Sequence, residues 1–366
     1  MLAPSFVISN KMLQWIGEIE ACRQIIELVD LSAEWEGKFK EDALIRSIYH
    51  GIRSDGGSLG RDEIGALIRE DPGRDENTPE VVKRLNLKVS VDEFQSAVNY
   101  RNAIRFSDQL SRLSQKTAGW QFLEKELGQM HSLMMEKINP AYELGVYRNL
   151  ALPASGGWRL RPPLPVEVPY QMDDLWFFLK RSNRDAVHPI IKAGIVYLEL
   201  KRIQPFRQGS NRVANVYLRL ILTTEGYSMK HFLSLEEHLD NNKPLFIQAI
   251  QRTEEDPTDI SQWLEYFVFV ISSEASKIKE RVKRLAAAIK IGDKNSRQIA
   301  LTERQVALME VFRMNEEMTM SQAREILPMV SDDSILRDLN GLVGKKLVRK
   351  KGKTKGAKYI IRRSEN

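Results

Sequence analysis

The residues with the clearest chemical potential lie in one short segment, residues 203–215 (IQPFRQGSNRVAN). Pro205 ends one helix, and Gly209 permits a tight turn before a second helix that reaches Gly226. Backbone N–H groups at the start of such a helix have no helical partners and attract anions. The segment therefore predicts a candidate anion-binding turn, formed by Gly209, Ser210, Asn211 and Arg212.

The segments around this turn have the pattern of helices. Residues 188–203 are apolar on nearly all sides, which predicts a helix that is buried all round, and residues 172–180 form another expected helix. Residues 51–60 and 71–79 are expected to be loops. Four capping boxes, in which two side chains satisfy each other's backbone amides, mark further helix starts. They are Ser90 with Glu93, Ser234 with Glu237, Thr302 with Gln305, and Thr319 with Gln322.

Residues 145–170 differ in kind from the rest of the chain. They alternate modestly in polarity, contain the turn sequence SGG at residues 155–157, and then carry prolines at positions 162, 163, 165 and 169. Proline has no N–H to donate inside a helix or a central strand. The pattern therefore predicts a small β-hairpin followed by an extended strap.

The sequence of residues 188–227 (HPIIKAGIVYLELKRIQPFRQGSNRVANVYLRLILTTEGY) resembles the core of the Fic (Fido) domain family. The family signature is His-Pro-Phe-x-Asp/Glu-Gly-Asn-Gly-Arg-x-x-Arg, of which Pro205, Phe206, Gly209 and Arg212 remain here. Upstream, the hairpin and strap resemble the flap of the family, and downstream segments resemble its later helices. The resemblance covers residues 90–275 in order.

The resemblance implies a chemistry that this sequence lacks the groups to perform. Active members transfer a nucleotide monophosphate, usually AMP from ATP, to a protein hydroxyl, using a histidine base, an acidic magnesium ligand and an arginine phosphate clamp. Gln204, Gln208 and Asn215 stand at those three places. A side-chain amide cannot accept a proton near neutral pH and is a poor ligand for a hard cation. We therefore expect no catalytic residue, no metal and no cofactor.

Other positions of the family pattern are also altered. The inhibitory helix of many members ends in Ser/Thr-x-x-x-Glu-Gly, and its counterpart here is RSIYHG, with Arg46 at the first position and His50 in place of the Glu. Arg219, one turn after Asn215, is a candidate replacement for the missing clamp. We interpret five histidines as surface or capping residues, because no two have the spacing of a helical zinc site. They are His50, His131, His188, His231 and His238.

Residues 300–366 have the pattern of a compact winged helix-turn-helix. Helices are expected at residues 302–314, 319–327 and 332–344, followed by two strands that bend around Gly352 and Gly356. Residues 345–363 hold ten Lys and Arg and no acidic residue, which suits contact with phosphates. Winged domains follow many Fic domains. The DNA-binding candidates are Ser334, Arg337 and Asn340 on the third helix and Arg349, Lys350, Lys351, Lys353, Lys355 and Lys358 in the wing.

Composition limits the classes of function. The 366 residues are 42% hydrophobic and 28% charged, which indicates a folded chain of two or three domains. The single cysteine, Cys22, excludes an intramolecular disulfide. No apolar run reaches the roughly 18 residues of a membrane helix, and we see no secretory signal. Residues 276–366 hold 22 Lys and Arg against 11 Asp and Glu, a net charge of +11, so residues 1–275 carry −5. Such asymmetry indicates an anionic partner.

We therefore predict a mainly α protein, with a helical Fic-like core, a small β-hairpin flap and a C-terminal winged helix-turn-helix. The expected domains are an N-terminal helical segment (1–88), the Fic-like domain (89–275), a basic linker helix (276–300) and the winged domain (301–366). The leading hypothesis is a DNA-binding transcriptional regulator with an inactive Fic-like domain, cytoplasmic and, by the resemblance, bacterial.

Two alternatives stay open. One is a Fic-fold enzyme with altered chemistry, which transfers nucleotidyl or other phosphoryl groups to protein hydroxyls. The other is a protein-interaction module, such as an antitoxin-like partner. The expected partner in the leading hypothesis is DNA, with room for a homodimer or a second protein, and no membrane.

Overall fold

The computed structural model describes residues 2–152, 162–182, 187–291, 301–315, 317–328, 330–352 and 357–362. The chain divides into two compact units. The larger unit comprises Met1–Glu27 and Phe39–Lys277, and the smaller unit comprises Leu28–Lys38 and Ile278–Asn366. Among the described residues, no helix is both long enough and apolar enough to cross a membrane.

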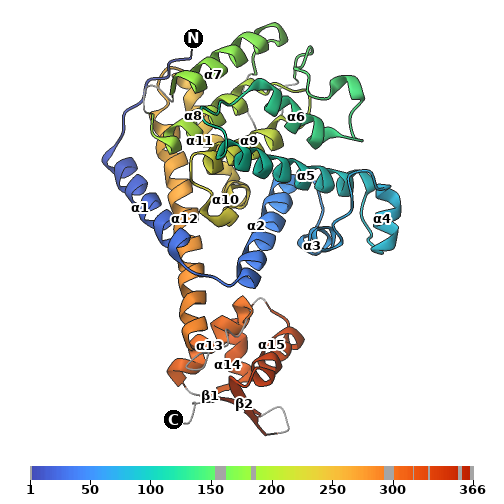
Figure 1. Cartoon of the computed structure of the whole chain (residues 1–366), viewed down its shortest axis with the longest axis vertical. Coiled ribbons are helices and arrows are strands. Elements are labelled where there is room, and N and C mark those ends of the chain that lie inside the picture. The colour runs from blue at the N-terminus through green and yellow to red at the C-terminus, as the bar shows by residue number, and fades with distance from the viewer. Residues whose placement is uncertain are drawn as a thin grey trace. The chain divides into compact units, whose positions relative to one another are not determined.

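The larger unit is built from helices, as Figure 1 shows. They are α1 (Asn10–Leu28), α2 (Ala33–Ser54), α3 (Arg61–Glu70), α4 (Thr78–Arg84), α5 (Val91–Ser114), α6 (Glu124–Met135), α7 (Val168–Ser182), α8 (Pro189–Ile203), α9 (Ser210–Thr224), α10 (Leu235–Asn241), α11 (Lys243–Glu255) and α12 (Ser261–Ile291). Three short 3-10 turns join them, η1 (Ala141–Glu143), η2 (Pro165–Glu167) and η3 (Met229–His231). The residues of α2 and of α12 are shared between the two units.

Helices α8 and α9 pack against each other at the centre of this unit. Ile190, Ile191 and Val196 lie on different sides of α8, yet each is at most 1% exposed, which confirms the expected buried helix. Helices α5 and α6 pack on α9, and α7 packs on α8. The turn between α8 and α9 is therefore held from several sides by other helices.

Polar contacts join the N-terminal residues to α12. The hydroxyl of Ser9 donates to Glu265 at 2.8 Å, and the hydroxyl of Ser272 donates to Glu18 at 2.9 Å. Ahead of α1, Ser5 forms a parallel backbone bridge with Asp259. The first helix of the chain thus lies beside its last long helix in the larger unit.

Three predicted boundaries were wrong. Helix α4 begins at Thr78, inside the loop predicted over residues 71–79. Helix α2 continues through Ser54, so residues 51–54 are helical and not part of a loop. Helix α7 begins at Val168 and not at residue 172, because Pro169 falls in its first turn, where the missing N–H has no partner in any case. Proline there starts the helix instead of extending the strap.

The predicted β-hairpin does not form where the structure can test it. Residues 145–152 contain no strand, and the turn at residues 155–157 lies outside the described residues. Of the strap, residues 162–164 are irregular and residues 165–167 form η2.

Two of the four predicted capping boxes form. The side chains of Thr302 and Gln305 satisfy each other's backbone amides at 3.2 and 3.1 Å, and the Thr319 box forms likewise. The Ser90 side chain makes no cap hydrogen bond, and the Glu93 carboxylate instead accepts from the Ser58 N–H and hydroxyl on another loop. At Ser234 the side chain also makes no cap hydrogen bond.

Besides parts of α2 and α12, the described residues of the smaller unit form three complete helices and a three-stranded antiparallel sheet. The elements follow the order α13 (Glu303–Asn315), β1 (Glu317–Thr319), α14 (Met320–Ile326), α15 (Asp332–Gly344), β2 (Val348–Lys351) and β3 (Lys358–Ile361). In the sheet, β3 lies between β1 and β2, with Met318 and Lys350 both opposite Tyr359. The three helices lie close to their predicted bounds. Strand β1 was not predicted, since three residues are too few to show an alternating pattern.

Helix α2 approaches α5 so closely that a side chain at Gly51 has no room. A Cβ built there would lie 2.1 Å from Cε1 of the fully buried Tyr100. We expect Gly51→Ala to lower the free energy of unfolding by about 1–3 kcal/mol, as overpacked core substitutions do. Urea unfolding followed by tryptophan fluorescence measures the change.

The matched control is Gly17→Ala in α1, where a Cβ would meet no atom within 4 Å. Alanine is favoured over glycine in a helix, so this variant should gain about 0.5–1 kcal/mol. Equal effects of the two substitutions would contradict the close approach of α2 and α5.

Candidate functional site

The turn between α8 and α9 is closed by its own hydrogen bonds. Gln204 ends α8 in the left-handed region (φ 45°, ψ 68°), and Gly209 precedes α9 with φ 73°. The Ser210 hydroxyl accepts from the Phe206 N–H and donates to the Phe206 carbonyl, both at 2.9 Å. A Cβ on Gly209 would lie 2.6 Å from Met135 Sδ, so both the backbone angle and the space require glycine. The Ser210 hydroxyl is thus used inside the turn.

His131 of α6 holds the turn through hydrogen bonds and through ring stacking. Its Nδ1 accepts the Gly145 N–H at 2.9 Å, so its Nε2 carries the proton and donates to the Gln208 carbonyl at 3.1 Å. The ring stacks on Phe206 with centroids 3.9 Å apart. Burial lowers the pKa of His131 to about 4, so the ring is neutral at neutral pH. A single tautomer therefore links α6, the turn and the segment that follows η1.

Arg148 fixes the other side of the turn. Its Nε donates to the Gln204 carbonyl at 2.8 Å, and its Nη2 donates to the Pro163 carbonyl at 2.7 Å. Its backbone N–H donates to the Pro205 carbonyl at 2.8 Å. The guanidinium is buried and bonded to main-chain oxygens, so it positions the turn and is not directed at a ligand.

A buried amine lies between α8 and α9. Lys201 is 3% exposed, and its Nζ donates to the Asn211 carbonyl at 3.0 Å and to Asn215 Oδ1 at 3.2 Å. The same Oδ1 accepts the hydroxyl of Tyr197 at 2.8 Å. Burial lowers the pKa of Lys201 to about 7, although Asp55 and Glu236 oppose the shift. Asn215 Oδ1 thus accepts its hydrogen bonds from two buried side chains.

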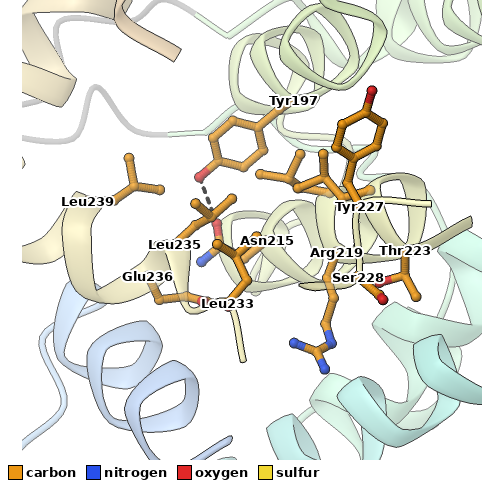
Figure 2. Close-up of a pocket in the computed structure, with 12 residues that line it drawn as sticks. Tyr197, Asn215, Arg219, Thr223, Tyr227, Ser228, Leu233, Leu235, Glu236 and Leu239 are labelled. Carbon is orange, nitrogen blue, oxygen red and sulfur yellow. Dashed lines mark hydrogen bonds between the residues drawn. The ribbon is translucent and has the colours of Figure 1, made fainter. Parts of the chain in front are cut away.

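The Asn215 amide group extends this network toward α5, α10 and α2. Asn215 Nδ2 donates to the Tyr100 hydroxyl at 3.4 Å, and that hydroxyl donates to Glu236 at 3.2 Å. Glu236 also accepts the hydroxyl of Ser47 at 3.0 Å. Figure 2 shows the Tyr197 hydroxyl directed at Asn215. It also shows Glu236, which lies on a neighbouring helix.

Arg212 of the predicted anion-binding turn and Arg219, the candidate replacement for the clamp, are both paired with acidic residues. Arg212 forms an ion pair with Asp55 at 2.9 Å and is largely buried. Arg219 forms one with Asp108 at 3.1 Å and also contacts His231. Burial alone would raise the pKa of Asp108, but Arg219 and His231 outweigh it and hold that pKa well below its usual range.

Residues 121–222, from the start of α6 to most of α9, match the Fic/DOC family model. This part of the chain is a Fic/DOC family domain. Among curated proteins, the protein adenylyltransferase Fic of Drosophila grimshawi is 20% identical over 235 residues, which are 61% of this chain and 44% of that protein. The chain thus matches less than half the length of this relative.

Solved structures share the fold of the chain. A Fic family protein from Desulfovibrio desulfuricans superposes with a TM-score of 0.61 over all of both chains, at 17% identity. A Fic domain containing signalling protein from Bacteroides thetaiotaomicron gives 0.55 at 13% identity, over 76% of this chain and 98% of that one. Fic-1 from Caenorhabditis elegans gives 0.54 at 18% identity, over 78% and 75%.

Within the Fic/DOC domain, the three altered signature positions do not converge on one open site. Gln208 is exposed and contributes its carbonyl to His131, and Gln204 contributes its carbonyl to Arg148. Asn215 points into the buried network. Among the residues of the predicted anion-binding turn, Ser210 bonds within the turn, Asn211 accepts from Lys201, and Arg212 pairs with Asp55.

The segment interpreted as a remnant of the inhibitory helix lies in α2. Arg46 donates to Glu237 at 2.6 Å, and His50 contacts Asp240 at 2.8 Å, so both engage α10 and not Asn215. The surface or capping interpretation was wrong for His50, His131 and His238, which are buried. For His188 it is confirmed, since its Nδ1 accepts the Ile190 N–H at the start of α8.

Within the described residues, two cavities border Asn215, and both are too small for a nucleotide. One, lined by Tyr197, Arg219 and Glu236 among others, has a volume of about 20 Å³ (Figure 2). The other, lined by His50, Asp55 and Lys201, has about 10 Å³. A cavity of that size holds at most one water, whereas ligand pockets measure about 300–1,000 Å³.

The DNA-binding candidates lie in the smaller unit. Arg337 and Asn340 on α15 and Arg349, Lys350 and Lys351 on β2 are exposed. Ser334 is half-buried and bonds with Ser331, and Lys358 forms an ion pair with Glu317 at 2.6 Å. Lys353 and Lys355 lie outside the described residues.

The buried groups that join the helices of the domain were not predicted from the sequence. Lys201 and Tyr197 lie in a run predicted only as apolar core, and Tyr100 and Glu236 lie on helices distant in sequence. One signal was available, because a lysine in a helix that is predicted to be buried all round needs hydrogen-bond acceptors. The identity of those acceptors depends on tertiary packing.

The buried amine predicts a pH dependence of stability. Between about pH 7 and 10.5 the unfolded chain still binds a proton that folded Lys201 has released, so the free energy of unfolding should rise with pH. The rise amounts to about 1 kcal/mol per pH unit. Lys201→Met should lack this rise when urea unfolding is measured at several pH values in that range.

The control is Lys192→Met, which replaces another buried lysine of α8, paired with Glu225 at 2.6 Å. This variant keeps Lys201 and should therefore keep the rise. Parallel pH profiles for the wild-type chain and Lys201→Met would show that the Lys201 amine titrates as it does in the unfolded chain.

Proposed function

We propose that this chain is a DNA-binding protein, a transcriptional regulator of the cytoplasm, whose Fic/DOC domain does not transfer nucleotides. The observation that carries the proposal is the basic surface of the smaller unit. Its order of three helices and three strands fits a winged helix-turn-helix, in which α15 enters the major groove and the β2–β3 hairpin forms the wing. The larger unit serves as a scaffold, a dimerisation surface or a sensor.

Helix α15 has one buried and one exposed face. Ile335, Leu339 and Leu342 are fully buried, while Arg337 and Asn340 are exposed. Arginine and asparagine are the side chains that most often read guanine and adenine. The acidic residues at the start of the helix are partly neutralised, since Asp332 pairs with Arg324. The exposed face can therefore approach DNA.

Strand β2 presents cations to solvent. Val348 is buried, and the next three residues, Arg349, Lys350 and Lys351, are exposed. Lys350 lies over the ring of Tyr359 at 5.8 Å, which orients its amine. Within the part of the chain that the structure describes, no ion pair joins these three residues to a carboxylate. They are available to phosphates.

Two kinds of observation, one chemical and one of available space, support the proposal that the Fic/DOC domain is inert. Transfer to a hydroxyl needs a group that accepts its proton, and the amide of Gln204 cannot. The Asn215 side chain is bonded to Lys201 and Tyr197, and the cavities beside it are of water size. These features support a structural role for the domain.

Fluorescence anisotropy with a labelled duplex tests DNA binding. Affinity should fall steeply with salt, with a slope of about −0.9 for each phosphate that the protein neutralises, on a double-logarithmic plot. The triple variant Arg349→Ala, Lys350→Ala, Lys351→Ala should weaken binding. It should also make the slope shallower by nearly 1 for each phosphate that is no longer neutralised.

A second triple variant controls for net charge. Lys83→Ala, Lys88→Ala and Lys125→Ala remove three exposed lysines of the larger unit and should leave the salt slope unchanged. The proposal fails if the wild-type chain does not bind DNA at low salt, or if both triple variants reduce affinity equally.

The alternative enzyme with altered chemistry is favoured by one feature, the retention of Arg212 beside the left-handed Gly209 turn. Our proposal predicts no transfer of label from nucleotides labelled at the α-phosphate to any protein. It also predicts that a nucleotide changes the melting temperature of Arg212→Ala by the same amount as that of the wild-type chain.

Arg207→Ala is the control, since Arg207 is an exposed residue of the same turn and pairs with Glu143. A nucleotide-induced stabilisation that is absent in Arg212→Ala and present in Arg207→Ala would instead favour the enzyme.

A further inference from the structure

An open cleft of about 600 Å³ lies on the larger unit, away from the turn between α8 and α9. It is formed by the connection from α3 to α4 and by α5 and α6, and its lining shares no residue with the cavities around Asn215. Its volume falls in the range of ligand pockets, in contrast to the two water-sized cavities beside Asn215. Charged and apolar side chains line it together, among them Asp71, Arg101, Arg105 and Phe106.

Two guanidinium groups share one carboxylate at this cleft. Arg101 is 1% exposed and lies 2.9 Å from Asp71, while Arg105 lies 2.7 Å from the same Oδ1 with 44% of its side chain exposed. Burial and the neighbouring Arg105 lower the pKa of Arg101. The three groups carry a net charge of +1. Since Arg101 also donates to the Pro72 carbonyl, the excess charge faces the cleft at Arg105.

The backbone around these charges is held in place. Asp71 adopts a left-handed conformation (φ 49°, ψ 53°), which non-glycine residues adopt at a cost. Both Arg74 donors to Glu136 are 2.7 Å from its oxygens, and Lys137 donates to the Arg74 carbonyl at 2.8 Å. The loop from α3 to α4 is therefore tied to the end of α6, and the cleft is formed before any ligand binds.

The remaining walls suit an organic group. Phe106 of α5 and Leu133 of α6 are half-buried and line the cleft together with the exposed amides of Gln109 and Gln129. An aromatic ring and an aliphatic side chain give a surface on which a flat group can pack. Side-chain amides can both donate and accept hydrogen bonds at its edge.

We propose that this cleft binds a small phosphate ester that bears a flat organic group, with Arg105 as the principal anion contact. Guanidinium groups bind phosphate oxygens through two parallel hydrogen bonds. The Asp71 carboxylate competes with the phosphate for Arg105, because it already pairs with one side of that guanidinium. It also cancels one of the two positive charges of Arg101 and Arg105.

Isothermal titration of the full chain with phenyl phosphate tests the proposal, with inorganic phosphate and phenol as the two half-ligands. Phenyl phosphate should bind more tightly than either. Arg105→Ala should weaken its binding at least about tenfold, the effect of removing a charge-assisted hydrogen bond. Arg61→Ala is the matched control, because Arg61 is exposed to a similar extent and pairs with Asp42 at 3.2 Å.

Asp71→Asn gives a result of opposite sign. Asparagine tolerates the left-handed conformation but carries no charge, so this variant should bind phenyl phosphate several-fold more tightly. A merely structural role for Asp71 would give weaker binding. The triple variant at residues 349–351 should bind like the wild-type chain, which separates the cleft from the basic smaller unit.

Each outcome of these titrations either supports or contradicts the proposed phosphate-ester site. Tighter binding by Asp71→Asn with weaker binding by Arg105→Ala supports the site. No heat with the wild-type chain, or equal affinity in Arg105→Ala and wild type, overturns it. Equal affinities for inorganic phosphate and phenyl phosphate overturn the assignment of the organic group. Should Asp71→Asn fail to fold, as judged by circular dichroism, the comparison of Arg105→Ala with Arg61→Ala still decides.

Discussion

The burial of one amine constrains the centre of the Fic/DOC domain. Lys201 has almost no contact with solvent, so its Nζ needs oxygen acceptors, and α9 supplies them through Asn211 and Asn215. An arginine in place of Asn215 would set a second cation against this amine. The Asn215 side chain is therefore suited to its surroundings, because its oxygen accepts from both Lys201 and Tyr197.

The residues of the family signature that remain have contacts that the fold itself requires. Phe206 is buried against the His131 ring, Gly209 has no space for a side chain, and the Pro205 carbonyl accepts from Arg148. Three of the replaced positions, Gln204, Gln208 and Asn215, are those at which the family signature has a histidine, an acidic residue and an arginine.

Much of the helical architecture could be predicted from the sequence, because periodicity and helix-end residues act locally. The buried α8 and the turn at Gly209 are examples. The start of α7 was missed because Pro169 is compatible with a first helical turn as well as with an extended strap. The pairing of Arg212 with Asp55 could not be predicted, since the two lie on segments that only tertiary packing brings together.

His131 shows how fully a histidine can be withdrawn from reactivity by its surroundings. One ring nitrogen accepts a main-chain N–H and the other holds the proton that it donates, so the imidazole has no lone pair to offer. A transition-metal ion or an acylating reagent could reach the ring only by breaking the support of the turn. The same two hydrogen bonds therefore make the His131 ring unreactive and hold the turn in place.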